Sequence, residues 1–364
     1  MTHSNAAATT FTTVQVPTTV GLDLSDRVSH FHVMRGDGHT LATGKVSTQR
    51  GDLSQLFERW KGCRLVIEAG GHSPWISRLG GACGLEVVVA NPRQVELISK
   101  SDHKTDRSDA EKLARLGRND VELLAPITHR SPQAQAHLAV RDARNAAVSA
   151  RTSLINFVRG KLKSNGHRAA SCSPECFHQR ALLAIPPELE LALRPMLQLI
   201  QQTNRQIKAF DQAIQRLCDE HYPVTQLLQQ VPGVGPIVSL SFVLTVDEPK
   251  RFRGREVGAY LGLVPRKKSS GQSDPQMHIT KAGDREMRRL LVLAANYILG
   301  RFGPDCDLRR FGLKLAAAGG PASKKRARVA VARKLAVLLH RLWSNGEEYD
   351  RLYLAKKRGE LAAT

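Results

Sequence analysis

The N-terminal third of the chain shows two kinds of hydrophobic pattern. Residues 20–24 and 31–33 alternate between apolar and polar side chains, which predicts strands with one buried face. Residues 64–67 and 87–90 are short apolar runs of the kind found in strands buried on both faces. Between these two runs, residues 73–79 have helical spacing with a proline near the start. Strands and helices therefore alternate here.

A further helix is expected from Thr105 onward, with Thr105 as its N-cap. Strands first, and then strand and helix in alternation, predict a layered α/β domain of the RNase H-like (RuvC-like) type over residues 19–125. Residues 1–18 are rich in Thr and Ala and contain no Lys or Arg, which indicates a disordered polar tail and no targeting peptide.

The middle section, residues 126–222, changes to apolar positions that step by four and three, as in heptad repeats. The first seam consists of Ala143, Ala147, Ala150, Leu154 and Phe157, and the second of Met196, Ile200, Thr203, Ile207, Phe210, Ile214 and Leu217. Two such helices predict an antiparallel hairpin or a coiled coil between protomers. The alternative is that each helix packs only on its own domain.

Residues 223–350 predict a mostly helical C-terminal domain, followed by a short tail at 351–364. Gly233 and Gly235 separate two apolar segments and resemble the turn of a helix-hairpin-helix DNA module, where glycine lets backbone N–H groups approach a phosphate. Basic residues also cluster in this region, and we treat six of them as candidate nucleic-acid contacts: Arg266, Lys267, Lys268, Lys281, Arg288 and Arg289. A solvated helix face is the alternative for any such cluster.

Overall charge agrees with a polyanionic partner. The chain has 54 Lys and Arg against 33 Asp and Glu, a formal net charge of +21, which favours nucleic acid because bound phosphates release counterions. A basic protein without such a partner is the alternative. Aromatic residues make up only 5%, which argues against aromatic stacking as the main mode of recognition.

The composition also bounds the location of the protein. No apolar run approaches the roughly 20 residues that cross a bilayer, so we expect no membrane association. Six scattered cysteines predict reduced thiols in a cytoplasmic protein. Cys172, Cys176 and His178 lie close in sequence, but no second pair has zinc-site spacing.

Four carboxylates stand out by their position in the predicted elements. Asp23 ends the first strand and Glu68 ends a buried strand, so adjacent parallel strands would place both at one sheet edge. Asp106 and Asp109 are three residues apart at a helix start and share a face. Clustered carboxylates repel unless a cation joins them, and oxygen ligands suit Mg²⁺, with Mn²⁺ as a substitute. Helix capping is the alternative for either aspartate alone.

These motifs resemble those of one transposase family, the insertion-sequence one-ten family, which is related to pilin-gene invertases and includes the bridge-RNA-guided recombinases. The N-terminal half carries the resemblance in Gly21-Leu22-Asp23, Ile67-Glu68-Ala69, Asn91-Pro92 and Lys104-Thr105-Asp106-Arg107-Ser108-Asp109-Ala110. The C-terminal half carries it in Val231-Pro232-Gly233-Val234-Gly235, Gly262-Leu263-Val264-Pro265, Ser270-Gly271, Ile279-Thr280-Lys281-Ala282-Gly283 and Arg288-Arg289.

The resemblance implies an enzyme that cuts and rejoins DNA. It implies that Asp23, Glu68, Asp106 and Asp109 form an acidic tetrad with Mg²⁺, and that Ser270 becomes covalently attached to DNA. Ser269 and Ser273 are the neighbouring alternatives for the nucleophile. The implied partners are double-stranded donor and target DNA, a guide (bridge) RNA that selects them by base pairing, and further copies of the chain in a dimer or tetramer. Lys104 is a further candidate phosphate contact.

Two other functions remain open at this point. A RuvC-like junction nuclease would use water as the nucleophile and would form no covalent adduct. A nucleic-acid-binding protein without catalysis would bind no metal at the acidic residues. His72 and His103 flank the acidic motifs, but histidines on a surface or in a core are commoner than catalytic ones, so we assign them no role.

Overall fold

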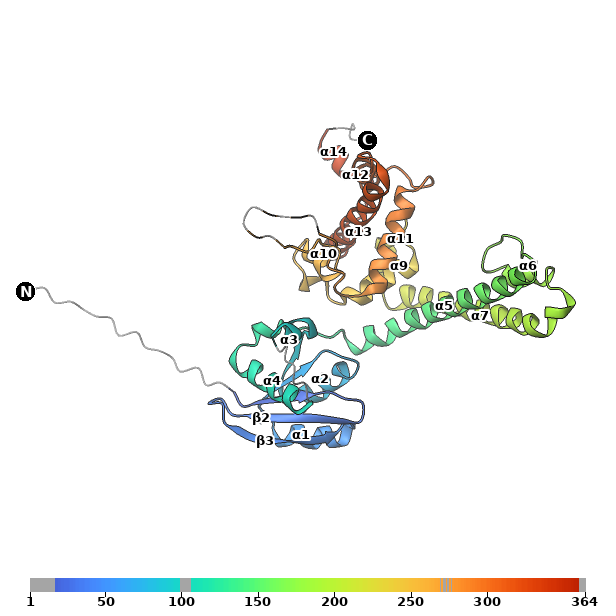
Figure 1. Cartoon of the computed structure of the whole chain (residues 1–364). Coiled ribbons are helices and arrows are strands. Elements are labelled where there is room, and N and C mark those ends of the chain that lie inside the picture. Colours follow the sequence, from blue (N-terminus) through green and yellow to red (C-terminus); the bar gives the residue numbers. More distant parts are fainter. Residues whose placement is uncertain are drawn as a thin grey trace, which may run out of the picture. The chain divides into compact units, whose positions relative to one another are not determined.

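The computed structural model describes residues 17–98, 106–268, 270, 273, 275 and 277–359, without the side chains of 96–98. The chain forms two compact units, Met1–His129 and Arg130–Thr364, each with its own core (Figure 1). The division lies close to the end of the predicted α/β domain. All six cysteines are free thiols, as expected. Among the described helices, none combines the length and apolar character needed to cross a membrane.

The N-terminal unit contains a five-stranded mixed sheet with the order β3-β2-β1-β4-β5. Its strands are β1 (Thr19–Asp23), β2 (Val28–Met34), β3 (Thr40–Ser47), β4 (Arg64–Glu68) and β5 (Glu86–Ala90). The first three strands pair antiparallel, and β4 joins β1 and β5 as a parallel neighbour of both. The predicted mixed α/β class is therefore confirmed, and the sheet is consistent with an RNase H-like fold.

Helices cover both faces of this sheet. They are α1 (Arg50–Arg59), α2 (Ser73–Ala82), α3 (Pro92–Ile98) and α4 (Asp106–Asn119), with a short 3₁₀ turn at Glu122–Leu124. Strand β4 explains the layering, because successive side chains of a strand point to opposite faces. Leu65 and Ile67 pack with Phe57 of α1, whereas Val66 packs with Leu113 of α4. The buried apolar run thus predicted a strand with helices on both sides.

Two long helices form a hairpin at the start of the C-terminal unit. α5 (Pro132–Ser164) and α7 (Pro187–Glu220) pack side by side, and the short α6 (Phe177–Leu182) closes the far end (Figure 1). The predicted seam on α7 is correct at Ile200, Ile207 and Ile214, which are buried.

The predicted seam on α5 is wrong by one to two positions. Leu154 packs against the core as predicted, but Ala143, Ala150 and Phe157 are exposed. The buried positions of α5 are Ala134, Leu138, Arg141, Arg151, Ile155, Val158 and Leu162. Alanine occurs on several faces of this helix, so its spacing does not single out the buried one. The true inner face includes two arginines that pair with carboxylates: Arg151 with Glu175 at 3.0 Å, and Arg141 with Asp142 and Asp284.

The rest of the C-terminal unit is a helical domain, as predicted. Its helices are α8 (Val224–Gln229), α9 (Pro236–Val246), α10 (Glu256–Tyr260), α11 (Arg285–Leu299), α12 (Asp307–Ala316), α13 (Gly320–Asn345) and α14 (Tyr353–Lys357), with a 3₁₀ turn at Pro249–Arg251. α9 is apolar on all sides and almost wholly buried, which identifies it as the central helix. α11 and α13 pack with it in one core.

One buried ion cluster joins the hairpin to this helical domain. Asp284 caps α11 by accepting from the Met287 N–H, and its carboxylate lies 3.4 Å from Arg141 of α5 and 3.5 Å from Arg130. Burial raises the pKa of Asp284, but the hydrogen bond from Met287 and the charges of the two arginines outweigh burial and lower it. Asp284 therefore stabilises the fold in its ionised form.

We expect Asp284→Ala to lower the free energy of unfolding by about 3 kcal/mol, because Arg141 would remain buried without this partner and α11 would lose its cap. Because the pKa of Asp284 is lowered, its contribution is complete above the ordinary carboxyl pKa of 3.8 and is lost as the pH falls below that value. Urea denaturation followed by circular dichroism at several pH values measures both effects. Asp142→Ala is the matched control, since Asp142 pairs with the same Arg141 but is 59% exposed. An equal loss in both variants would contradict the assignment.

Candidate active site

Two of the four predicted carboxylates lie at the ends of neighbouring parallel strands. Asp23 is the last residue of β1 and Glu68 the last residue of β4, and the register pairs Leu22 with Ile67 just before them. Both side chains are half-buried. The strand pattern therefore placed these two residues correctly at one edge of the sheet.

The other two carboxylates, Asp106 and Asp109, lie in the first turn of α4. This helix lies directly on the sheet because glycine occupies two contact positions. A Cβ at Gly21 would lie 2.1 Å from the Ala110 carbonyl oxygen and 2.5 Å from the Ala114 nitrogen. A Cβ at Gly117 would lie 2.3 Å from a methyl group of Val66. The glycine that precedes Asp23 by two residues thus sets how closely the first turn of α4 approaches β1.

His30 connects the strand end with the helix start. It pairs with Asp23 across the antiparallel β1–β2 ladder, and its Nδ1 lies 3.7 Å from an Asp106 carboxylate oxygen. Sequence reasoning considered other histidines and missed this one. The sequence did contain a signal for His30, because an antiparallel hairpin over residues 19–34 places residue 30 opposite residue 23. Of the histidines considered, His72 contacts Asp26 at 3.1 Å, and His103 lies outside the described residues.

The four carboxylates differ in surroundings. Asp106 is 69% exposed, whereas Asp109 is 22% exposed and lies 3.2 Å from Lys112. Across the described residues, no three His, Cys, Asp or Glu side chains are grouped closely enough to hold a metal ion. The donor chemistry of these residues, all carboxylate oxygen, nevertheless suits Mg²⁺. The tetrad as a metal site therefore remains a prediction, with Asp23, Glu68 and Asp106 near one edge of the sheet.

Ser270, the predicted nucleophile, belongs to the C-terminal unit and lies on an exposed antiparallel hairpin. Arg266 donates its N–H to the His278 carbonyl at 2.9 Å, and Thr280 donates to Val264 at 2.9 Å. Farther out, the backbones of Ser270 and Ser273 exchange hydrogen bonds of 3.1 and 3.0 Å. Ser270 itself is exposed. A hydroxyl in this position is accessible to a large substrate such as DNA.

The base of this hairpin is held by close backbone contacts. Gly262 has φ of +67°, and a Cβ there would lie 2.3 Å from both the nitrogen and the oxygen of Ala282. Gly283 has φ of +68°, and a Cβ there would lie 2.2 Å from the Tyr260 carbonyl oxygen. Arg288 donates from Nη1 to the carbonyl oxygens of Leu261, Ala282 and Gly283. The Gly-Leu-Val-Pro and Lys-Ala-Gly motifs (residues 262–265 and 281–283) therefore form a closely packed base of the Ser270 hairpin, which we call the neck.

The predicted nucleic-acid contacts fall into different environments. Arg266, Lys267, Lys268 and Lys281 are exposed on or beside the hairpin, whereas Lys104 lies outside the described residues. Arg288 is engaged in the neck, and Arg289 forms an ion pair with Glu286. These bonds give both arginines a structural role that sequence reasoning did not foresee. Their contact with nucleic acid remains a prediction.

Gly233 and Gly235 lie in the turn between α8 and α9, as predicted. Gly233 has φ of +79°, and a Cβ there would lie 3.0 Å from the Ala294 carbonyl oxygen of α11. Gly235 is the N-cap residue of α9. The close approach at Gly233 is thus a contact within the domain, so helix packing explains this glycine without a phosphate. A phosphate contact at either glycine stays a prediction.

Comparison with known proteins covers both regions. A family model for DEDD transposases of IS110 elements, described as "Transposase", matches residues 20–165. A second, described as "Transposase IS116/IS110/IS902 family", matches residues 225–309. The chain belongs to the IS110/IS116/IS902 family of transposases. The first match spans Asp23, Glu68, Asp106 and Asp109, and the second spans Ser270.

Curated relatives agree with this assignment along most of the chain. The putative transposase y4pF/y4sB of Sinorhizobium fredii is 29% identical and aligns with 91% of this chain and 85% of its own length. The transposase for insertion sequence element IS1111A of Coxiella burnetii is 28% identical, over 91% of this chain and 90% of its own length. The probable family 20 transposase of Pseudomonas aeruginosa is 28% identical, over 80% and 86%. This IS110-family transposase is thus an insertion-sequence transposase that acts on DNA, and the DEDD match suggests dependence on a divalent metal ion.

We expect Gly21→Ala to destabilise the N-terminal unit of the transposase by about 3 kcal/mol, because the added methyl group overlaps the backbone of α4. Thermal unfolding of the full chain measures the loss. Gly51→Ala is the control, since a Cβ at Gly51 in α1 meets no atom within 4 Å, and stability there should stay constant or rise by up to about 1 kcal/mol. Equal stability of the Gly21→Ala variant and the wild type would show that α4 does not lie as closely on β1 as described.

Proposed function

We propose that this transposase cuts and rejoins DNA strands through a covalent phosphoserine intermediate at Ser270, with Asp23, Glu68, Asp106 and Asp109 holding the divalent metal ion. The observation that carries the proposal is the exposed serine on a braced hairpin. Ser270 lies beyond the neck formed around Gly262 and Gly283 and is exposed. This exposure supports the proposal, because the hydroxyl can approach a DNA phosphate.

The proposed reaction has two transfers at phosphorus. In the first, the Ser270 hydroxyl loses its proton as its oxygen bonds to phosphorus, the bond from phosphorus to a DNA oxygen breaks, and that oxygen takes up a proton and leaves as a DNA hydroxyl. In the second, a DNA hydroxyl attacks the same phosphorus and the serine oxygen leaves with a proton. Neither transfer consumes another reactant, so strands are exchanged without hydrolysis. The serine needs activation, because a free hydroxyl is a weak nucleophile.

The acidic residues would supply that activation through Mg²⁺ or Mn²⁺. The ion, when bound, stabilises negative charge on the attacking and leaving oxygens. Asp23 and Glu68 are held at adjacent strand ends, and α4 carries Asp106 to the His30 side chain opposite Asp23. We propose that these carboxylates and Ser270 act on the same phosphodiester, in a dimer or tetramer.

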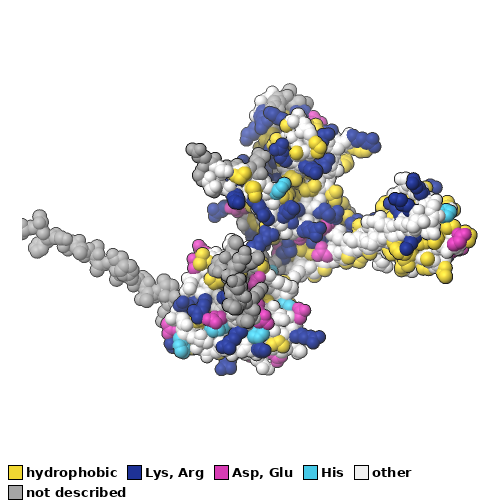
Figure 2. Space-filling model, in the orientation of Figure 1, with side chains coloured by type: hydrophobic (Ala, Val, Ile, Leu, Met, Phe, Trp, Pro, Cys, Tyr) yellow, Lys and Arg dark blue, Asp and Glu magenta, His cyan; other side chains and the backbone are white. Residues whose placement is uncertain are grey.

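Selection of DNA sites would belong to a guide (bridge) RNA that pairs with donor and target DNA. The net charge of +21 supports binding of large polyanions such as RNA and DNA. Lys and Arg side chains are spread over the visible face of the C-terminal unit (Figure 2). Sequencing of RNA that copurifies with the protein tests this part. Recovery of one defined RNA species supports the proposal, whereas RNA-free protein that recombines specific sites contradicts it.

We expect Ser270→Ala to abolish the protein–DNA adduct and to reduce strand exchange by roughly a thousandfold or more, because no other group takes over the covalent step. Trapping with labelled DNA followed by denaturing electrophoresis detects the adduct. Ser273→Ala is the matched control, since Ser273 is the hydrogen-bonding partner of Ser270 on the same hairpin and should retain the adduct. Strand cleavage by Ser270→Ala without an adduct would instead indicate a junction nuclease that uses water.

We expect Glu68→Gln and Asp106→Asn to lose both the adduct and the heat of manganese binding, with strand exchange reduced at least about a hundredfold, because the amide is a poorer metal ligand than the carboxylate. Calorimetric titration of the full chain provides the binding measurement. Asp52→Asn, an exposed carboxylate on α1, should behave like the wild type. If the Glu68 and Asp106 variants bind manganese as well as the wild type does, these residues are not metal ligands.

A further inference from the structure

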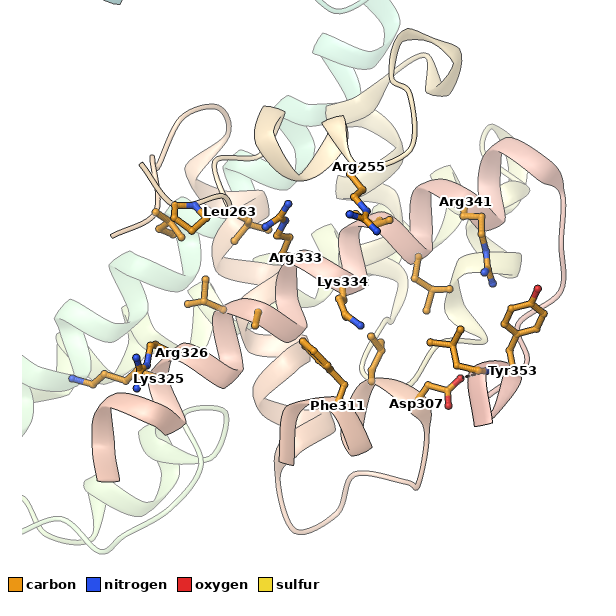
Figure 3. A pocket seen from close by; sticks show the side chains of 18 of the residues that line it. Arg255, Leu263, Asp307, Phe311, Lys325, Arg326, Arg333, Lys334, Arg341 and Tyr353 are labelled. Carbon is orange, nitrogen blue, oxygen red and sulfur yellow. Dashed lines mark hydrogen bonds between the residues drawn. The ribbon is translucent and has the colours of Figure 1, made fainter. Parts of the chain in front are cut away.

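A large groove lies in the C-terminal unit between α13 and the segments around it. Its volume is about 1460 Å³, and its walls come from Arg255 at the N-cap of α10, from α12 and α14, and from the base of the Ser270 hairpin. Figure 3 shows Arg326, Arg333, Lys334 and Arg341 following one another along α13. The helix between Arg326 and Arg341 spans roughly 22 Å. That length matches about six stacked nucleotides of one strand.

The groove is strongly cationic. Eight of its lining side chains are Lys or Arg and two are Asp. Both aspartates are engaged locally, because Asp307 accepts from the Leu354 N–H at 2.6 Å and Asp350 pairs with Lys356 at 3.2 Å. Within the described ranges, Arg255, Arg333 and Lys334 form no ion pair with a carboxylate. The groove therefore carries positive charge that its own residues do not neutralise.

The electrostatics around Lys334 favour binding of an anion. Burial lowers the pKa of Lys334, and the positive charges of Arg358 and Arg255 lower it further, against the opposing effect of Asp307. A phosphate beside Lys334 would relieve this repulsion.

The floor of the groove is apolar, which a phosphate contact alone does not explain. Leu263, Leu308 and Val337 line it together with the half-buried ring of Phe311. Lys334 Nζ lies 3.8 Å from the centre of that ring, so cation and ring form one surface (Figure 3). A duplex presents phosphates and keeps its bases stacked inside, whereas an unpaired strand presents both phosphates and base faces. Alternating cations and apolar side chains therefore suit an unpaired strand.

The groove continues onto the hairpin that carries Ser270. Pro265, Ile279 and Lys281 belong to both. A strand in the groove would thus lie beside the stalk of the proposed nucleophile. The small aromatic share of the chain is compatible with this, because the groove is lined by three aromatic side chains, Phe311, Tyr349 and Tyr353, and by several aliphatic ones.

We propose that this groove binds an unpaired DNA strand, with phosphates at Arg255, Arg333 and Lys334 and bases against Phe311 and the aliphatic floor, and holds it beside the Ser270 hairpin. The role beside Ser270 rests on the proposed function, whereas strand binding does not. Binding and adduct formation can therefore be tested separately.

Fluorescence anisotropy with the full chain and a labelled 12-nucleotide DNA strand, its duplex and the RNA of the same sequence tests the proposal. We expect the double variant Arg255→Gln/Arg333→Gln to weaken single-strand binding at least about tenfold and to reduce its salt slope by roughly 1.4, as expected for two lost phosphate contacts. Duplex binding should change by less than about twofold, because duplex does not reach the apolar floor. Arg205→Gln/Arg216→Gln, which changes two exposed arginines on α7, is the matched control and should bind all three ligands normally.

The apolar floor is tested by Phe311→Leu, which keeps an apolar side chain in the core contact but removes the ring. We expect single-strand binding to weaken about fivefold, the lower end of base–aromatic stacking. Phe157→Leu is the matched control, because Phe157 is exposed on α5 and lies under Lys161 in a similar cation–ring pair. Unchanged melting temperatures show that both variants fold.

Three results would overturn the proposal: equal losses for single strand and duplex, no loss for any nucleic acid, or tighter binding of RNA than DNA with the same sensitivity to the groove variants. Ser270→Ala separates this inference from the proposed function. If the Ser270→Ala variant binds the strand normally and forms no adduct, both the groove proposal and the proposed function are supported. An adduct in this variant would exclude Ser270 as the nucleophile but would not contradict strand binding in the groove.

Discussion

The acidic site depends on a backbone contact in which glycine leaves room for a helix. α4 lies on β1 at Gly21, where a Cβ would overlap the Ala110 carbonyl oxygen, and this contact brings Asp106 to the strand that ends in Asp23. The serine hairpin depends on the same kind of contact at Gly262 and Gly283, each of which has a positive φ and a neighbouring backbone within 2.3 Å of its missing Cβ. In both regions, backbone packing thus positions the elements that carry the candidate side chains, among which Asp106 and Ser270 are exposed.

Charge is distributed differently around these two regions. In the N-terminal unit, Asp23 and Glu68 end adjacent strands, and Asp106 lies 3.7 Å from His30. Carboxylates that come close together repel each other unless a cation binds between them. In the C-terminal unit, the groove along α13 has an excess of arginine and lysine over an apolar floor. A DNA strand carries the negative charge that would neutralise this groove. Membership of the IS110 family implies a DNA substrate, which agrees with the excess of positive charge in the groove.

Much of the fold follows from local patterns in the sequence, and the misses have physical causes. The periodicity of apolar residues predicted strands of the sheet and located Asp23 and Glu68 at strand ends, because the end of a buried strand can be recognised from the sequence alone. His30 was missed because its place depends on pairing between two strands. Arg288 was assigned to nucleic acid because charge alone does not reveal that three carbonyl oxygens accept from it. The groove was missed because the residues that face the cations of α13, among them Arg255, Leu263 and Phe311, come from separate segments that only the folded chain brings together.

The most direct test is to map the site of covalent attachment. The transposase is allowed to react with DNA in the presence or absence of Mg²⁺, digested with nuclease and trypsin, and analysed by tandem mass spectrometry of the peptide 269–281, which contains all three candidate serines. The account predicts a nucleotide on Ser270 that forms only with the divalent ion. Cleaved DNA with no modified serine in that peptide would contradict it.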